Sequence, residues 1–178
     1  MKRFLSLFLA LVVTSAHATT PAILNHTLNP LLPGKPIALS QYAGKAVLVV
    51  NVASRCGFTP QYAGLETLHK RYESKGLVIL GIPANDFGAQ ELASNKDIAE
   101  FCQKNYGVSF PMFEKLDAPL PKQPFHAALI KATGQAPQWN FHKYLIDRGG
   151  KVTSFSSNVE PLSPALVTAI ESALNSKR

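Results

Sequence analysis

The sequence predicts an α/β domain with a central mixed sheet flanked by helices. Two nearly continuous apolar runs, over 46–52 and 77–82, are rich in β-branched residues, as strands covered on both faces are. A segment of helical periodicity separates them, which predicts a βαβ unit with parallel strands. Further along, the turn sequence DRGG at 147–150 joins two shorter strand-like segments, which indicates an antiparallel hairpin.

The first half of the chain gives clear boundaries for these elements. Residues 19–45 are rich in proline, and the turn signal at 32–35 predicts a small N-terminal β-hairpin. A helix is expected over 60–74, because Pro60 suits a first helical turn and Gly76 a helix stop.

In the second half, Ser94 and Asp97 resemble a capping box that opens a helix ended by Gly107. The order of elements predicts a thioredoxin-like fold, with a parallel βαβ half, an antiparallel ββα half and helices on both faces. The remaining expected elements are a short helix from Pro124 to Gly134, strands over 141–146 and 151–155, and a last helix capped by Ser163.

The N-terminus has the pattern of a secretory signal peptide. Lys2 and Arg3 precede an apolar run over 4–13, and an Ala-His-Ala site follows. The run is too short for a transmembrane helix, which needs about 20 apolar residues. We therefore expect residues 1–18 to be removed on export, with the bacterial periplasm as destination, and residues 19–178 to form one domain.

Composition narrows the possible functions. The net charge of +7 is dispersed along the chain, which disfavours nucleic-acid binding. No His and Cys cluster has metal-ligand spacing, so neither a metal site nor a cofactor is expected. The chain has two cysteines, Cys56 and Cys102, and in an exported protein such a pair can be a structural disulfide. A chain of this length does not need a disulfide to fold, so that alternative is weakened but stays open.

Cys56 is placed where a cysteine becomes reactive. It lies between a buried strand and a predicted helix, where backbone N–H groups and the helix dipole stabilise a thiolate. Arg55 adds a positive charge next to it. Thr59 occupies the fourth position of the Cys-x-x-Cys pattern that is common at this turn, so exchange between two cysteines of one motif is excluded. The turn predicts a nucleophilic cysteine.

Four motifs, in order along the mature chain, resemble one known family. They are NVASRCGFT at 51–59, FGAQE at 87–91, FCQKNYG at 101–107 and WNF at 139–141. Together they are similar to the glutathione peroxidase family, in its cysteine-containing, thioredoxin-dependent branch. Cys56 stands where some members carry selenocysteine.

The resemblance implies a catalytic tetrad of Cys56, Gln90, Trp139 and Asn140. A thiolate that attacks a peroxide oxygen needs donors for the leaving oxygen. Two side-chain amides and an indole N–H supply them without burying another charge. The product is a sulfenic acid on Cys56. Taken singly, the tryptophan, the glutamine and the asparagine each suit a structural role; their arrival together with the cysteine turn favours catalysis.

Cys102 matches the resolving cysteine of the two-cysteine members. Its place on the apolar side of a helix also suits an inert buried thiol, and both interpretations stay open. Bridged cysteines need Cα atoms within about 7 Å, so we expect the helix to loosen before Cys102 attacks the oxidised Cys56.

The resemblance implies a thiol peroxidase that reduces hydrogen peroxide and organic or lipid hydroperoxides and is recycled by a thioredoxin-like donor. Glutathione as donor, a non-catalytic redox sensor and a structural exported domain are the alternatives. The short connection 115–123 lacks the loop through which tetrameric members associate, so a monomer is expected. Asp86, Ala84 and the Leu92-Ala93 pair depart from the usual family residues, and no catalytic role is assigned to them.

Overall fold

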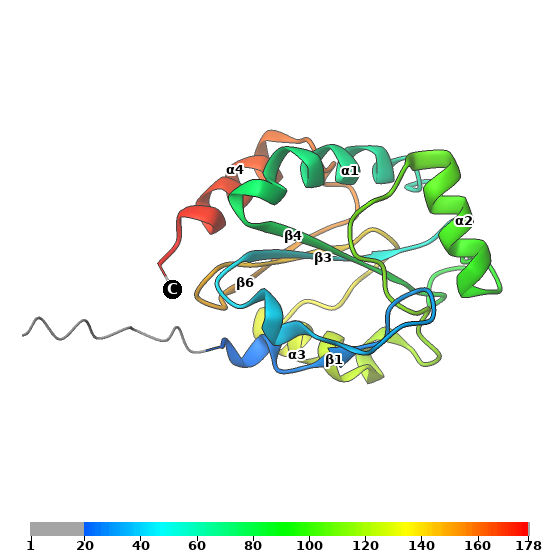
Figure 1. Ribbon diagram of the computed structural model, residues 1–178, viewed down its shortest axis with the longest axis horizontal. Coiled ribbons are helices and arrows are strands. Elements are labelled where there is room, and N and C mark those ends of the chain that lie inside the picture. Colours follow the sequence, from blue (N-terminus) through cyan, green and yellow to red (C-terminus); the bar gives the residue numbers. More distant parts are fainter. Residues whose placement is uncertain (1–19, 178) are drawn as a thin grey trace, which may run out of the picture.

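The computed structural model of the chain describes residues 20–177, so the predicted signal peptide lies outside the described residues. Its centre is a four-stranded sheet in the order β4-β3-β5-β6, in which β3 runs parallel to β4 and antiparallel to β5 (Figure 1). The strands are β3 (Ala46–Val52), β4 (Leu77–Pro83), β5 (Lys143–Ile146) and β6 (Val152–Phe155). The predicted thioredoxin-like fold is therefore confirmed.

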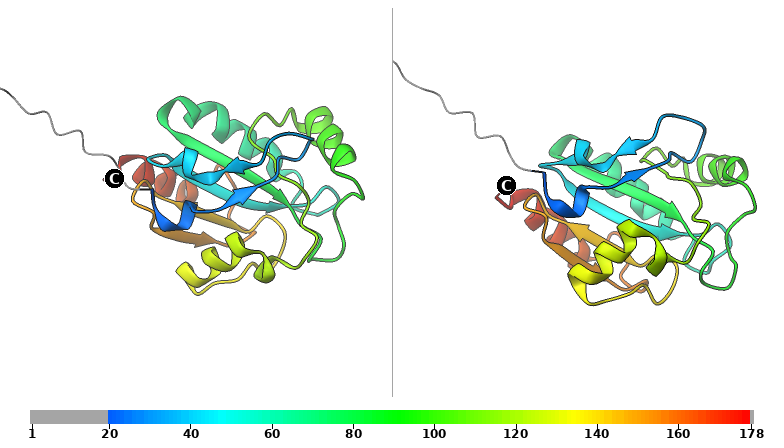
Figure 2. Two further views of the ribbon diagram at one scale, coloured as in Figure 1. Left: turned by 60° about the horizontal axis from the view of Figure 1, so that its bottom comes forward. Right: turned by 90° about the horizontal axis from the view of Figure 1, so that it is seen from below.

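Helices cover both faces of the sheet. In Figures 1 and 2, α1 and α4 pack on one face, α3 and the N-terminal hairpin on the other, and α2 lies beyond one end of the sheet. The helices are α1 (Gln61–Tyr72), α2 (Asn95–Tyr106), α3 (Pro124–Thr133) and α4 (Pro164–Asn175), and the hairpin pairs β1 (Thr27–Leu28) with β2 (Ile37–Ala38). Short 3₁₀ turns are η1 (Ala22–Leu24), η2 (Leu39–Tyr42), η3 (Glu73–Lys75) and η4 (Leu120–Lys122).

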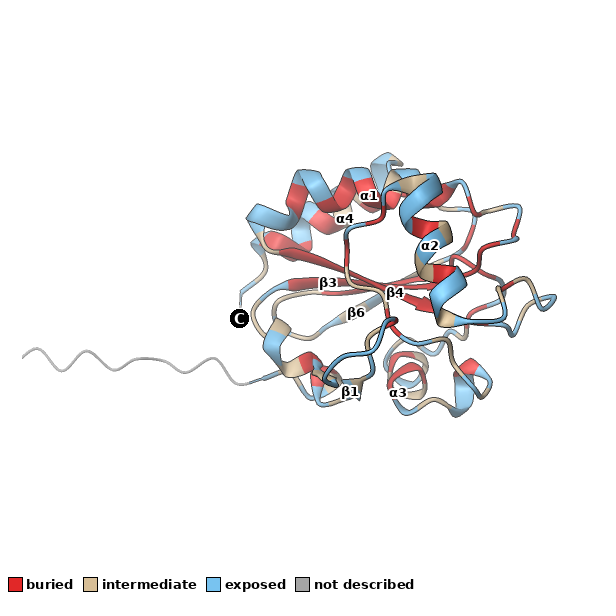
Figure 3. Ribbon diagram, turned by 45° about the vertical axis from the view of Figure 1, so that its right-hand side comes forward, coloured by how far each residue is buried: buried red, intermediate tan, exposed pale blue. Residues whose placement is uncertain are grey.

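Strands β3 and β4 are buried along their whole length, as Figure 3 shows in red. Because successive side chains of a strand point to opposite faces, β3 contributes to two cores. Leu48 and Val50 pack with α1, α2 and α4, whereas Val47 and Val49 pack with α3. The apolar runs that predicted the strands thus serve both faces of the sheet.

Hydrogen bonds confirm the predicted N-caps of α2 and α4. The Ser94 hydroxyl accepts the N–H of Asp97 at 3.1 Å, and Ser163 caps α4 by accepting the N–H of Leu166. Gly107 ends α2 with a φ of 60°, a left-handed conformation that glycine adopts at little cost. No helix in the described part of the chain is long and apolar enough to cross a membrane.

One boundary differs from the prediction in a way that shapes the site. Strand β5 begins at Lys143 rather than at Phe141, because Phe141 has a φ of 63°. A bulky residue rarely adopts this left-handed conformation. The N–H of Phe141 donates to the carbonyl of Asn51 at 2.6 Å, so the turn before β5 is fixed to the end of β3.

Candidate active site

Cys56 lies in a series of tight turns between β3 and α1. Its sulfur accepts the backbone N–H of Phe58 at 3.4 Å, and its own N–H donates to Oγ1 of Thr59 at 2.9 Å. The Thr59 hydroxyl in turn donates to the carbonyl of Ala53 at 2.9 Å. The cysteine is 8% exposed, so it is held in a rigid turn with only a small opening to solvent.

The local electrostatics of Cys56 differ in detail from the sequence prediction. Helix α1 begins at Gln61, five residues after the cysteine. The backbone N–H of Phe58, in the turn before the helix, donates to the sulfur. The side chain of Arg55 is exposed, and its backbone N–H donates to the carbonyl of Gln90 at 2.9 Å. That bond joins the cysteine turn to the second motif.

Glu91 makes a further connection between these two segments. Its Oε1 accepts the N–H of Ser54 at 3.0 Å and the N–H of Leu92 at 2.8 Å. The side chain is buried, and burial raises its pKa above the usual value for a carboxyl group. The sequence analysis gave Glu91 no role. An acidic residue in a loop that meets an apolar turn is the signal that could have identified it.

The WNF motif contacts the FGAQE motif through a side chain. Asn140 is fully buried, and its Nδ2 donates to Oε1 of Gln90 at 3.1 Å and to the carbonyl of Phe87 at 3.3 Å. The carbonyl of Trp139 accepts a hydrogen bond of 3.1 Å from Nδ2 of Asn51, at the end of β3. Hydrogen bonds therefore link the segments of Gln90 and of Trp139 and Asn140 to each other and to the stretch around Cys56.

Trp139 is the exposed member of this group. Its side chain is 39% exposed, and its ring lies 5.7 Å from that of Phe87, centroid to centroid. Because Oε1 of Gln90 faces Asn140, Nε2 of Gln90 is the end left to donate. Trp139 is thus open to solvent, whereas the amides of Gln90 and Asn140 are oriented by their hydrogen bond.

Cys102 lies on the inner side of α2 and is 2% exposed. It belongs to the same apolar core as Cys56, and both cysteines are free thiols. Burial raises the pKa of the Cys102 thiol to about 11, and the neighbouring Tyr62 hydroxyl offsets only part of that effect. Burial on the inner side of α2 thus favours the protonated form of the thiol.

A buried lysine lies next to the turn that carries Trp139 and Asn140. Lys143 is completely buried, and its Nζ donates to Oε1 of Gln61 at 2.7 Å and to the carbonyl of Phe141 at 2.8 Å. Burial lowers its pKa to about 8. The sequence analysis missed this residue, although a single lysine at the start of an apolar strand marks a charge that needs a partner.

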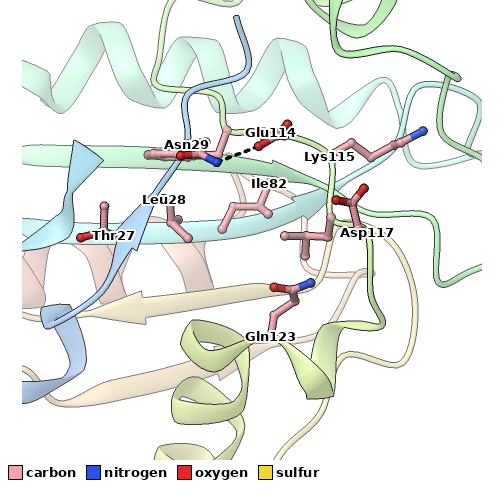
Figure 4. A pocket seen from close by; sticks show the side chains of 10 residues that line it. Thr27, Leu28, Asn29, Ile82, Glu114, Lys115, Asp117 and Gln123 are labelled. Atoms are coloured by element: carbon pink, nitrogen blue, oxygen red, sulfur yellow. Dashed lines mark hydrogen bonds between the residues drawn. The ribbon is translucent and has the colours of Figure 1, made fainter. Parts of the chain in front are cut away.

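Two pockets are lined by none of the residues of the cysteine turn. Figure 4 shows a pocket of 230 Å³ between β1, the end of β4 and the segment 113–117, where Asn29 donates to Glu114 at 3.0 Å. It contains neither cysteine and none of the predicted site residues. An apolar hollow of 400 Å³ lies between the segment 30–32 and α2, and Cys102 lines part of it. Within residues 20–177, no group of three or more His, Cys, Asp or Glu side chains is placed to hold a metal ion.

Comparison with known proteins gives a consistent result. The family model described as "Glutathione peroxidase" matches residues 26–125. A glutathione peroxidase-like peroxiredoxin of Chlamydomonas reinhardtii is 46% identical over 157 residues, which cover 81% of this chain and 91% of the relative. A hydroperoxy fatty acid reductase of Synechocystis is 46% identical over 145 residues, which cover 80% of this chain and 94% of the relative.

Solved structures agree with this result. The crystal structure of Trgpx in its apo form superimposes with a TM-score of 0.68 at 31% identity and covers 91% of this chain and 98% of its own. MTB dsbF has a TM-score of 0.63 at 18% identity, covers 88% of this chain and 100% of its own, and shows the fold alone. The chain belongs to the glutathione peroxidase family, in its cysteine-containing, peroxiredoxin-like branch, and is a peroxidase of that family.

Proposed function

We propose that the chain reduces hydroperoxides through the Cys56 thiolate. The sulfur attacks one peroxide oxygen, the O–O bond breaks, and the second oxygen leaves as water or an alcohol after it takes a proton. Cys56 keeps the attacked oxygen as a sulfenic acid. Gln90, Trp139 and Asn140 would serve the leaving oxygen, Gln90 and Trp139 as direct donors and Asn140 through the orientation of Gln90.

The observation that carries this proposal is the position of Gln90. Its backbone carbonyl accepts the N–H of Arg55, next to Cys56, and its side-chain oxygen accepts the amide of Asn140. Gln90 is thereby tied to both the cysteine turn and the WNF motif, and the donor end of its side chain is left free. A hydrogen-bond donor fixed beside a thiolate is what a departing alkoxide or hydroxide requires.

The test is peroxide turnover coupled to NADPH oxidation, with thioredoxin and its reductase or with glutathione and its reductase. We expect turnover with thioredoxin, and complete loss in Cys56→Ser. Cys102→Ser is the matched control in a single turnover without donor: it removes a thiol of the same core, but it should still consume one equivalent of peroxide, because the first oxidation of Cys56 stays intact. Equal turnover in wild type and Cys56→Ser would refute the proposal.

We further propose that Cys102 resolves the sulfenic acid. Its sulfur attacks the Cys56 sulfur, the S–O bond breaks, and the hydroxyl group leaves as water. Because Cys102 is buried on α2 and protonated, this step requires α2 to loosen first. One equivalent of peroxide should give an intramolecular Cys56–Cys102 disulfide in the peptide map. A persistent sulfenic acid with Cys102 still free would exclude this step.

The donor and the range of substrates follow from the relatives and the surface of the site. A dithiol donor of the thioredoxin type would reduce the disulfide and be oxidised itself, and glutathione is the competing candidate. The exposed Trp139 and its neighbour Phe87 give the entrance an aromatic surface that suits organic and lipid hydroperoxides besides hydrogen peroxide. The name of the Synechocystis relative, a hydroperoxy fatty acid reductase, supports the lipid substrates.

A redox sensor is the second candidate function, since the same sulfenic acid can pass its oxidation to another protein. The buried, protonated Cys102 favours it, because slow resolution lengthens the life of the sulfenic acid. Slow turnover and a mixed disulfide with a partner protein, accumulating in Cys102→Ser, would identify this role.

We also propose that residues 1–18 direct export to the periplasm and that the mature enzyme is a monomer. The Lys-Arg start, the apolar run and the Ala-His-Ala site support the first proposal. The short connection 115–123, between α2 and α3, supports the second. Mass spectrometry of the purified N-terminus and light scattering of the mature chain test them, with Thr19 as first residue and the mass of one chain as the expected results.

A further inference from the structure

The inference concerns Lys143, whose ammonium group is completely buried on β5. A buried charge is costly unless hydrogen bonds satisfy it. Both of its acceptors are well placed, Oε1 of Gln61 at 2.7 Å and the carbonyl of Phe141 at 2.8 Å. Neither acceptor is itself charged; the carboxylate of Glu160, which accepts from Nε2 of Gln61, is the negative charge that favours the charged form of Lys143.

One acceptor, Gln61, follows Cys56 in the chain, and the other, Phe141, follows Asn140. Gln61 is the first residue of α1 and follows Cys56 by five positions. Its Nε2 donates to the carbonyl of Ser157 at 2.8 Å and to Glu160 at 3.2 Å, so its orientation is fixed. Its Oε1 is therefore presented to Lys143.

On the other side, Phe141 directly follows Asn140. Its φ of 63° is strained for a bulky residue, and such a conformation persists only when its surroundings hold it. The N–H of Phe141 is bonded to Asn51, and its carbonyl is bonded to Lys143. The lysine thus completes the hydrogen bonding of the residue that aims the Trp139–Asn140 turn.

We propose that Lys143 is a positioning residue of the peroxidase site: its buried ammonium group fixes the Trp139–Asn140 turn relative to the helix that follows Cys56. The inference rests on the proposed function. A shift of this turn moves Asn140, and Asn140 holds the side chain of Gln90. A displacement of about 1 Å in such a constellation can lower a rate by about 100-fold.

The test separates the geometry of the site from the reactivity of the thiol. Reaction of Cys56 with hydrogen peroxide needs the donors for the leaving oxygen, whereas alkylation by iodoacetamide needs only the thiolate. In Lys143→Met we expect the ratio of these two rates to fall by roughly 30- to 100-fold. Rates are measured by quenched flow, with mass spectrometry of the Cys56 peptide.

Tyr144→Phe is the matched control. Tyr144 is the next residue of β5 and belongs to the core on the opposite face, where its hydroxyl donates to the carbonyl of Gln135 at 2.6 Å. This variant loses one partly buried hydrogen bond and leaves the site residues unchanged. We expect its ratio of rates to stay within about threefold of wild type, so a loss caused by general destabilisation is recognised.

Gln61→Met provides an independent test in case Lys143→Met does not fold. It removes the acceptor on the α1 side, and we expect the same ratio to fall by about tenfold or more. An unchanged ratio in either folded variant overturns the inference. If the wild-type enzyme reacts with iodoacetamide but reduces no peroxide, the proposed function itself fails, and that outcome is distinct.

Discussion

The side-chain amide of Asn140 donates a 3.1 Å hydrogen bond to Oε1 of Gln90, 50 positions earlier in the chain. The same amide donates to the carbonyl of Phe87, and Asn140 is fully buried. A buried donor that faces two oxygen atoms cannot be exchanged for an acceptor without repulsion. This relationship makes Asn140 the residue that sets the direction of the Gln90 amide.

Asn140→Asp should therefore replace the hydrogen bond to Oε1 of Gln90 with repulsion between two oxygen atoms. The carboxylate would face two oxygen atoms, and the Gln90 side chain would turn away from its place. We expect the rate of Cys56 oxidation by peroxide to fall by about 10²- to 10³-fold, the loss typical for removal of one oriented donor. Pre-steady-state peroxide consumption measures it. Asn158→Asp, at an exposed position, is the control; equal rates in the two variants would contradict the prediction.

The cap of α2 gives a prediction about resolution. Ser94→Ala removes the hydroxyl that accepts the Asp97 N–H, at a cost of about 1 kcal/mol to the helix. If α2 must loosen before Cys102 reaches Cys56, the disulfide should form up to about fivefold faster. The lifetime of the sulfenic acid, followed by quenched flow and mass spectrometry, is the measurement.

Ser163→Ala is the matched control for this experiment. It removes the equivalent cap of α4, which carries no cysteine, and its disulfide should form at the wild-type rate. Equal rates in the two cap variants would mean that loosening of α2 does not limit resolution.

Glu91 gives a prediction in which two substitutions diverge. Glu91→Ala leaves the N–H groups of Ser54 and Leu92 without their acceptor and should cost about 2 kcal/mol of stability, together with much of the peroxide reactivity. Glu91→Gln keeps an oxygen at the same place. Urea unfolding and the rate of Cys56 oxidation distinguish the two variants, and similar losses in both would contradict the assigned role.

The pH dependence of Glu91→Gln has a definite sign. Burial raises the pKa of Glu91 in the folded state, so folding favours the protonated form. Its contribution to stability is present at low pH and is lost as pH rises through the folded pKa. Glu91→Gln should therefore become more stable relative to wild type as pH rises above 4.5. A difference that is constant with pH would show that the carboxyl group is not desolvated in solution.

Two buried histidines predict weakening in mild acid. Burial lowers the pKa of His126 and of His142 from 6.5 to about 4. Between these values the unfolded chain binds protons that the folded chain does not bind, so stability falls as pH drops from about 6.5 to about 4. Each histidine contributes roughly 3 kcal/mol to the fall.

The experiment compares wild type with His126→Phe in urea unfolding across this pH range. The Nε2 of His126 is buried without a hydrogen-bond partner, so an apolar ring of similar size should be tolerated. The variant should lose about half of the histidine-dependent slope. An unchanged slope would show that His126 is protonated in the folded state.

Elements that depend on nearby residues could be predicted from the sequence. The apolar runs of β3 and β4, the caps Ser94 and Ser163 and the stop at Gly107 follow from local chemistry, and the structure agrees with them. The residues around Cys56 suggested a reactive thiol, but Gln90, Trp139 and Asn140 were recognised through the family resemblance, since nothing local distinguishes them from surface residues.

What the sequence could not predict arises from contacts between distant segments. The left-handed turn at Phe141 is imposed by bonds to Asn51 and Lys143, and no residue near it in the chain favours that conformation. The double acceptor role of Glu91 likewise exists only when two loops meet. The start of α1 at Gln61 rather than at Pro60 is a smaller difference at a helix end, where boundaries are least well determined.

Trp139 is the single tryptophan of the chain, it is 39% exposed, and its indole lies against the ring of Phe87 in the loop that carries Gln90. Its fluorescence therefore originates at one known position, and the emission depends on the solvent exposure and the packing of the indole. Each chemical change of Cys56 and each movement of the neighbouring loops alters these surroundings. The fluorescence of Trp139 can therefore be used to follow the successive steps of a turnover by stopped flow without an added label.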